Sequence, residues 1–155
     1  MNAAAIMLGM LKYQTIPVTP FAQNCSLIWC DETKEAAVID PGGDLDRLRD
    51  AASMLKLDLR HIWLTHAHID HAGGTGQLAR ELGLPIIGPH TGDQFWIDAL
   101  PEQSQMFNFA PAETFQPNRW LNDGDTVSLG AHEIQVRHCP GHTPGHVVFY
   151  APQIK

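Results

Sequence analysis

Thr65-His66-Ala67-His68-Ile69-Asp70-His71 follows directly on the apolar run His61-Ile62-Trp63-Leu64 and places three imidazoles and one carboxylate within six residues. Neutral imidazole is the commonest protein ligand for zinc and related divalent ions. A short apolar run predicts a buried strand. We therefore interpret residues 65–71 as a metal-binding loop at the end of such a strand.

The spacing inside this loop indicates two ions rather than one. Side chains of an extended segment alternate between faces, so His66 and His68 point the same way and can bind one ion. Asp70 continues that face, whereas His71 follows where the chain can turn into a helix and can reach a second ion. The chain has nine histidines, so some of them are bystanders. Four ligand-type side chains this close together, however, rarely coincide by chance.

A second histidine cluster lies far along the chain, in His138-Cys139-Pro140-Gly141-His142-Thr143-Pro144-Gly145-His146. Proline and glycine on both sides of His142 predict a rigid, sharply turned loop that holds one imidazole in a fixed direction. His142 is therefore the natural third ligand beside His66 and His68. Only tertiary folding can join the two loops, as expected of a catalytic site rather than of a compact zinc finger.

The other side chains of this second cluster receive structural interpretations. His138 ends a strand-like run and His146 begins one, so we favour packing or supporting roles over metal binding for both. Cys139 is expected to be a small buried residue. With Cys25 and Cys30 it makes an odd, sparse set that predicts no disulfide framework, which favours a reducing compartment and a cytoplasmic location.

Together these motifs resemble the metallo-β-lactamase superfamily, and most closely its glyoxalase II-like branch, the hydroxyacylglutathione hydrolases. Within that branch the compact bacterial members, which lack a separate helical glutathione-binding domain, are the most similar. The resemblance covers the chain from about Leu11 to its end. Besides the two histidine motifs it rests on Asn24-Cys25-Ser26-Leu27-Ile28, Val38-Ile39-Asp40-Pro41-Gly42-Gly43 and Trp120-Leu121-Asn122-Asp123-Gly124-Asp125.

The resemblance implies an α/β fold of the four-layer αββα type and a centre of two divalent metal ions, with zinc expected first and iron or manganese as alternatives. Its implied metal ligands are His66, His68, Asp70, His71 and His142. The first metal would take the three residues His66, His68 and His142. Asp70 would also act in catalysis by orienting a hydroxide, and Asp40 would support the ligands from behind the loop.

The chain also departs from the family pattern. The family places a metal-bridging Asp after the next strand and another His near the end of the domain, but the 13 residues after His142 contain no Asp and only His146. We therefore expect residues 11–155 to be the N-terminal part of a longer metallo-β-lactamase-fold domain, with an incomplete second sheet and uncovered apolar surface. Residues 1–10 lack the positive start of a signal peptide and are too short to span a bilayer, so they are expected to be an extension.

Strands and helices alternate along the chain, which predicts an α/β fold. Strands are expected at 13–18, 26–30, 35–40, 61–64, 85–88, 126–129, 133–138 and 147–150, and helices at 44–56, 74–82 and 91–100. Residues 101–118 contain three Pro and three Phe without a clean period. They are expected to form a long loop whose aromatic side chains line a substrate cleft or fill a gap between layers.

Composition narrows the class of function. With 44% hydrophobic residues the chain can bury the core of one domain. A net charge of −7 argues against nucleic acids and anionic membranes as partners, while the oligomeric state stays open.

The resemblance implies a hydrolase of glutathione thioesters, which would convert S-D-lactoylglutathione to D-lactate and glutathione with a hydroxide generated at the metal. Two alternatives stay open. One is a mononuclear-iron dioxygenase that acts on glutathione persulfide, and the other is a non-catalytic fragment.

Overall fold

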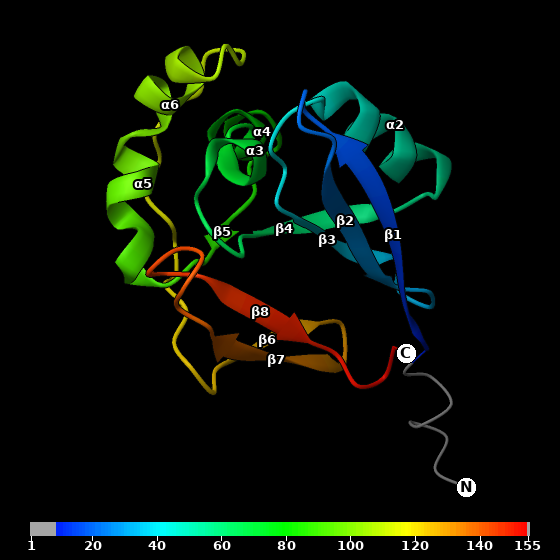
Figure 1. Ribbon diagram of the computed structural model, residues 1–155. Coiled ribbons are helices and arrows are strands. Elements are labelled where there is room, and N and C mark those ends of the chain that lie inside the picture. Colours follow the sequence, from blue (N-terminus) through cyan, green and yellow to red (C-terminus); the bar gives the residue numbers. More distant parts are fainter. Residues whose placement is uncertain (1–8, 155) are drawn as a thin grey trace, which may run out of the picture.

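Two β-sheets stack on one another, and helices lie on the far side of the first sheet (Figure 1). The computed structural model describes residues 9–154, so most of the expected extension at 1–10 lies outside the described residues. The first sheet has the strand order β1-β2-β3-β4-β5 and the second has the order β6-β7-β8. Their strands, in chain order, span Leu11–Val18, Gln23–Cys30, Glu35–Ile39, Asp58–Trp63, Ile86–Ile87, Thr126–Leu129, His132–His138 and Val147–Tyr150.

The helices connect the strands of the first sheet and then lead to the second. Helix α2 (Leu45–Met54) joins β3 to β4, and α3 (Ile69–Ala72) and α4 (Thr75–Leu82) join β4 to β5. A 3-10 turn, η1 (Thr91–Asp93), and the helices α5 (Gln94–Asp98) and α6 (Leu100–Met106) follow β5. None of the helices formed by residues 9–154 has the length and apolar character that a membrane crossing needs.

Parallel pairing in the first sheet brings the predicted metal loop to one edge. Strands β1, β2 and β3 pair antiparallel, whereas β3, β4 and β5 pair parallel. Ile39 lies opposite Trp63, and Trp63 lies opposite Ile87, so the carboxyl ends of these three strands meet. Asp40 and Thr65 therefore leave the sheet close together. Loops at this edge of a parallel sheet commonly form binding sites.

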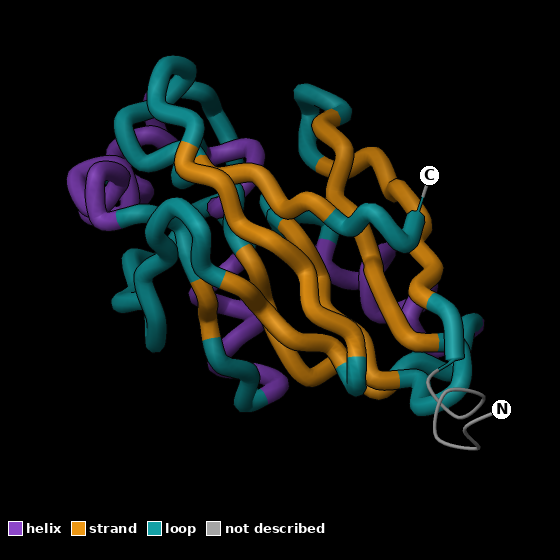
Figure 2. Tube along the Cα trace, turned by 90° about the horizontal axis from the view of Figure 1, so that it is seen from below, coloured by secondary structure: helices purple, strands orange, loops and turns teal. Residues whose placement is uncertain are grey.

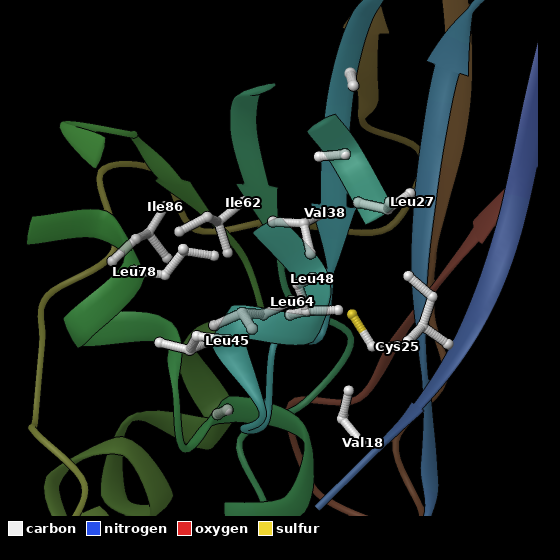
Figure 3. Close-up of a cluster of buried hydrophobic side chains, with 14 of the residues drawn as sticks. Val18, Cys25, Leu27, Val38, Leu45, Leu48, Ile62, Leu64, Leu78 and Ile86 are labelled. Atoms are coloured by element: carbon white, nitrogen blue, oxygen red, sulfur yellow. The ribbon is translucent and has the colours of Figure 1, made fainter. Parts of the chain in front are cut away.

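Two buried clusters hold three layers together (Figure 1, Figure 2). Between the helices and the first sheet, Leu48 of α2 and Leu78 of α4 join Val38 and Ile62 of the strands in one cluster (Figure 3). On the opposite face, a second cluster around the fully buried Trp63 joins the first sheet to the second. The α/β class is thus confirmed. The described residues form three layers: the helices, the first sheet and the second sheet.

The outer face of the second sheet is less apolar than expected. Strand β7 exposes Glu133, Gln135 and Arg137 there. The apolar side chains exposed on β8 are Val148 and Tyr150, at 37% and 55% of their full surface. The exposed side chains of β7 are therefore polar, and the uncovered apolar surface of β8 is limited to these two residues.

Several predicted elements differ in their bounds from those observed. Strand β2 begins at Gln23 rather than at residue 26, and the helix expected at 91–100 is divided into η1 and α5. Helix α6 begins at Leu100 and runs into the part that was expected to be a loop, because Pro101 stands in its first turn, where a missing N–H needs no partner. Strand β4 begins at Asp58 rather than His61. The first half of β4 pairs with β3, but its polar side chains are exposed. The sequence therefore shows no run of apolar residues there that would indicate a strand.

Asp44 precedes α2 as expected, but its side chain makes no capping hydrogen bond. The residue has a φ of 51°, and its carboxylate instead accepts a hydrogen bond of 2.8 Å from the backbone N–H of Thr19. Asp44 therefore joins the turn after β1 to the start of α2. The end of α4 is as expected, since Gly83 follows it with a φ of 66°.

We expect Gly42→Ala to lower the free energy of unfolding by about 2 kcal/mol or more, because an added Cβ is a case of overpacking. That Cβ would lie 1.7 Å from the carbonyl oxygen of Asp70, so the start of α3 would have to move. Gly141→Ala is the matched control, since a Cβ there meets nothing within 4 Å. Urea denaturation of both variants tests this, and equal midpoints would contradict it.

Candidate metal centre

The two histidine loops meet at the carboxyl edge of the first sheet. The first loop leaves β4 and enters α3, and the second connects β7 to β8. The backbone N–H of Val147 donates to the carbonyl of Thr65 at 2.8 Å, which ties the second loop to the first. Residues that are far apart in sequence are thereby brought to one place.

His66, His68 and His142 form one group whose candidate ligand nitrogens all lie within 4.8 Å of one another. Nδ1 of His68 and Nε2 of His142 are 3.2 Å apart. Two ligands of a single tetrahedral zinc ion would be separated by about 3.3 Å, given usual Zn–N distances. His66 is buried and His142 is exposed, so the group is open to solvent on one side.

A chain of hydrogen bonds fixes the tautomer of His66. The Thr65 hydroxyl donates its only proton to Oδ2 of Asp40 at 2.5 Å, so toward Nδ1 of His66, 2.9 Å away, it must accept. Nδ1 of His66 therefore carries the proton, and Nε2 carries a lone pair. That Nε2 is buried without a hydrogen-bond partner among the described residues. A buried lone pair without a partner fits a metal ligand.

Burial keeps this imidazole neutral. Burial, followed by repulsion from the surrounding imidazoles of His71, His146, His68 and His142, lowers the pKa of His66 to about 2. Burial and the neighbouring His142 also lower the pKa of His68. For His71 burial acts in the same direction, but the hydrogen bond and charge of Asp40 outweigh it and raise the pKa. Neutral imidazole is the form that binds metals.

Asp40, His66 and His71 form a second group with candidate ligand atoms within 4.8 Å. Both oxygens of Asp40 are already in use. Oδ1 accepts from the backbone N–H of Thr65 at 2.8 Å, and Oδ2 accepts from Nδ1 of His71 at 2.9 Å. This arrangement favours a supporting role for Asp40. It leaves Nε2 of His71 3.6 Å from Oδ2 of Asp70, so the two residues expected at the second metal lie together.

His138 and His146 lie outside both groups. The ring of His138 stacks on that of His90, with centroids 3.9 Å apart, and its Nε2 lies 2.9 Å from the carbonyl of Pro144. The ring of His146 lies 4.9 Å from that of His66. Cys139 is exposed rather than buried, so that prediction is wrong. Residues of β7 alternate between faces, and Cys139 continues its outward-facing series.

Two residues that hold the loops in place were not predicted from the sequence. Asp93 of η1 is fully buried and accepts hydrogen bonds from both histidine loops. Gln103 of α6 accepts from the backbone N–H of Ile69 at 3.0 Å and donates to the carbonyl of Trp96 at 2.9 Å. Neither residue stands in a pattern that indicates a long-range contact, and Gln103 lies in the segment that was expected to be a loop.

Residues 18–153, which include both histidine loops, match the family described as the metallo-beta-lactamase superfamily. The chain belongs to the metallo-beta-lactamase superfamily. Its first sheet, second sheet and converging histidine loops are therefore the metallo-beta-lactamase fold in this protein.

Relatives within the superfamily carry more specific names. The chain is 45% identical over 140 residues to a hydroxyacylglutathione hydrolase, GloC, of Haemophilus influenzae, and covers 66% of that protein with 90% of its own length. It is 32% identical to a hydroxyacylglutathione hydrolase of Bdellovibrio bacteriovorus and covers 49% of it with 91% of its own length. The chain thus spans from about half to about two thirds of the length of these relatives.

A solved structure of similar fold contains metal. The crystal structure of TTHA1623 in a di-iron-bound form superimposes with a TM-score of 0.77 at 31% identity, over 90% of this chain and 67% of that one. The three imidazoles and the buried nitrogen of His66 show that the residues present here fit a divalent cation.

We expect His142→Gln to lower the zinc affinity of the protein by orders of magnitude, because the group loses one of three imidazoles. His138→Gln changes a histidine of the same motif that lies outside the group, so this variant should keep its affinity. Competition with a chromophoric chelator measures both. Equal losses in the two variants would refute the assignment of His142.

Thr65→Val should lower zinc affinity about 10–100-fold, the usual effect of removing a hydrogen bond that orients a metal-binding histidine. The valine leaves Nδ1 of His66 without its partner and so releases the tautomer. Thr65→Ser keeps the hydroxyl and should bind zinc as tightly as the unchanged protein. If valine and serine bind equally, the hydroxyl does not set the tautomer.

Proposed function

We propose that this protein hydrolyses thioesters of glutathione, with S-D-lactoylglutathione as the first substrate to test. The observation that carries the proposal is the convergence of His66, His68 and His142 around the buried, unpartnered Nε2 of His66. The 45% identity to a relative named hydroxyacylglutathione hydrolase supports this choice of substrate within the superfamily.

In this proposal the five predicted ligands divide between two metals. His66, His68 and His142 bind the first, and Asp70 and His71 belong to the second, with Asp40 holding His71 by its Nδ1. Zinc suits an imidazole-rich site, and iron or manganese are the alternatives. The di-iron-bound relative supports iron as an alternative to zinc.

The chain's own residues have defined tasks in such a reaction. When bound, a divalent metal would lower the pKa of water and polarise a carbonyl oxygen. The carboxylate of Asp70 is partly exposed and its Oδ2 lies 3.6 Å from Nε2 of His71, so it can accept a hydrogen bond from an attacking water and orient it. A thiolate is a good leaving group, so the site needs no strong general acid.

The partners proposed are small glutathione-derived molecules rather than nucleic acids or membranes, in keeping with the net charge of −7.

A cytoplasmic location is also part of the proposal. It is supported by the odd, sparse set of three cysteines in the sequence, which predicts no disulfide framework. Burial and the charge of Asp40 raise the pKa of the Cys25 thiol, which disfavours its reactive thiolate form.

The proposal predicts that protein loaded with zinc, iron or manganese releases free thiol from S-D-lactoylglutathione. Asp70→Asn should lower kcat about 100-fold or more, in the range of general acid–base effects. Asp98→Asn, at an exposed carboxylate of α5, is the matched control and should keep full activity. An intact thioester with all three metals would refute hydrolysis by this chain and favour the non-catalytic fragment. Iron-dependent oxygen consumption with glutathione persulfide would favour the dioxygenase instead.

A further inference from the structure

We propose that Asp93 is a positioning residue that joins the two histidine loops and sets the place of His142 relative to His66 and His68 before a metal binds. The inference rests on the metal centre of the proposed function. Asp93 lies on η1, outside both histidine motifs. It belongs to neither group of candidate metal ligands.

The contacts of Asp93 reach both loops. Its Oδ2 accepts from the backbone N–H of Ala67 at 2.9 Å and from the hydroxyl of Thr143 at 2.8 Å. Its Oδ1 accepts from the backbone N–H of Gly145 at 2.7 Å. Ala67 stands between His66 and His68, and Thr143 directly follows His142. One carboxylate therefore holds the neighbours of all three candidate ligands.

Burial makes these bonds strong and hard to replace. Asp93 has no exposed surface, and burying a carboxylate without hydrogen bonds would be costly. All three partners are donors, which suits an ionised carboxylate, because that group can only accept. Hydrogen bonds to an ionised group are short and about twice as strong as those between neutral groups. The bonds to Asp93 thus resist separation of the loops.

The backbone around Asp93 packs closely against the second histidine loop. A Cβ on Gly145 would lie 2.5 Å from the backbone N of Asp93 and 2.6 Å from the carbonyl oxygen of His90. A Cβ on Gly92 would lie 3.0 Å from the carbonyl of Pro144. The backbone N–H of His90 also donates to the carbonyl of Gly145 at 3.1 Å. The 3-10 turn and the second loop are in direct backbone contact.

The two loops come from different sheets, so a relative movement of the sheets would separate His142 from the other two imidazoles. With Asp93 in place the three neutral imidazoles are assembled in advance. Without it, part of the free energy of metal binding would go into bringing the loops together. Metal affinity at this group is therefore the quantity that Asp93 controls.

Thr143→Val tests the inference with little disturbance, because it removes one hydroxyl and keeps the shape of the side chain. Binding of Co²⁺ is followed by its visible spectrum, which reports both affinity and coordination. We expect Thr143→Val to weaken Co²⁺ binding about 10–100-fold and to change the spectrum, as for other residues that orient metal ligands. Thr143→Ser restores the hydroxyl and should restore both. Asp93→Asn should weaken binding further, and Asp98→Asn should leave it unchanged.

Each outcome bears on a different proposal. If the unchanged protein binds no Co²⁺, the metal centre itself is wrong. If it binds Co²⁺ and Thr143→Val binds equally with the same spectrum, the role of Asp93 is refuted. If the variants do not fold, amide hydrogen exchange in the metal-free, unchanged protein tests whether Asp93 holds the two loops. Slow exchange at Ala67 and Gly145 is expected, and fast exchange at Gly145 would overturn the inference.

Discussion

The metal centre depends on the carboxylate of Asp40, which joins the end of β3 to both ends of the histidine loop. It accepts from Thr65 at the start of the loop and from His71 at its end. Asp40 has a φ of 59°, a left-handed conformation that Asp adopts more readily than most residues. Strained backbone of this kind persists where the surrounding contacts determine it, and here three donors do so. The tautomer of His66 follows from the same carboxylate.

Supports of different kinds hold the two loops. Asp40 acts within the first sheet, between adjacent parallel strands, whereas Asp93 acts between the sheets from the 3-10 turn that follows β5. Gln103 adds a third support from α6 by accepting from the start of α3. The apolar cluster around Trp63 keeps the sheets stacked. The relative positions of the three imidazoles thus depend on core packing as well as on hydrogen bonds.

The sequence predicted which side chains lie together where chemistry restricts the residue type, and it did not do so where many residue types would serve. Metal ligation requires particular side chains at particular spacings, so the grouping of His66, His68 and His142 could be predicted. An acceptor such as Asp93 can stand anywhere in the chain, and only the folded structure shows which amides it meets. The exposure of Cys139 could have been read from the alternation of β7. Helix α6 was missed because Pro101, which ends helices elsewhere, is tolerated in a first turn.

The distance along the chain between the candidate ligands has a kinetic consequence. His68 and His142 are 74 residues apart and belong to loops of different sheets. A chain in which only the first sheet has formed offers two of the three imidazoles, so an ion encountered then would be held weakly. Contacts of such long range form late because closing the intervening loop costs entropy. Tight metal uptake would therefore mark the docking of the two sheets, and the ion would stabilise the product of folding rather than guide its early steps.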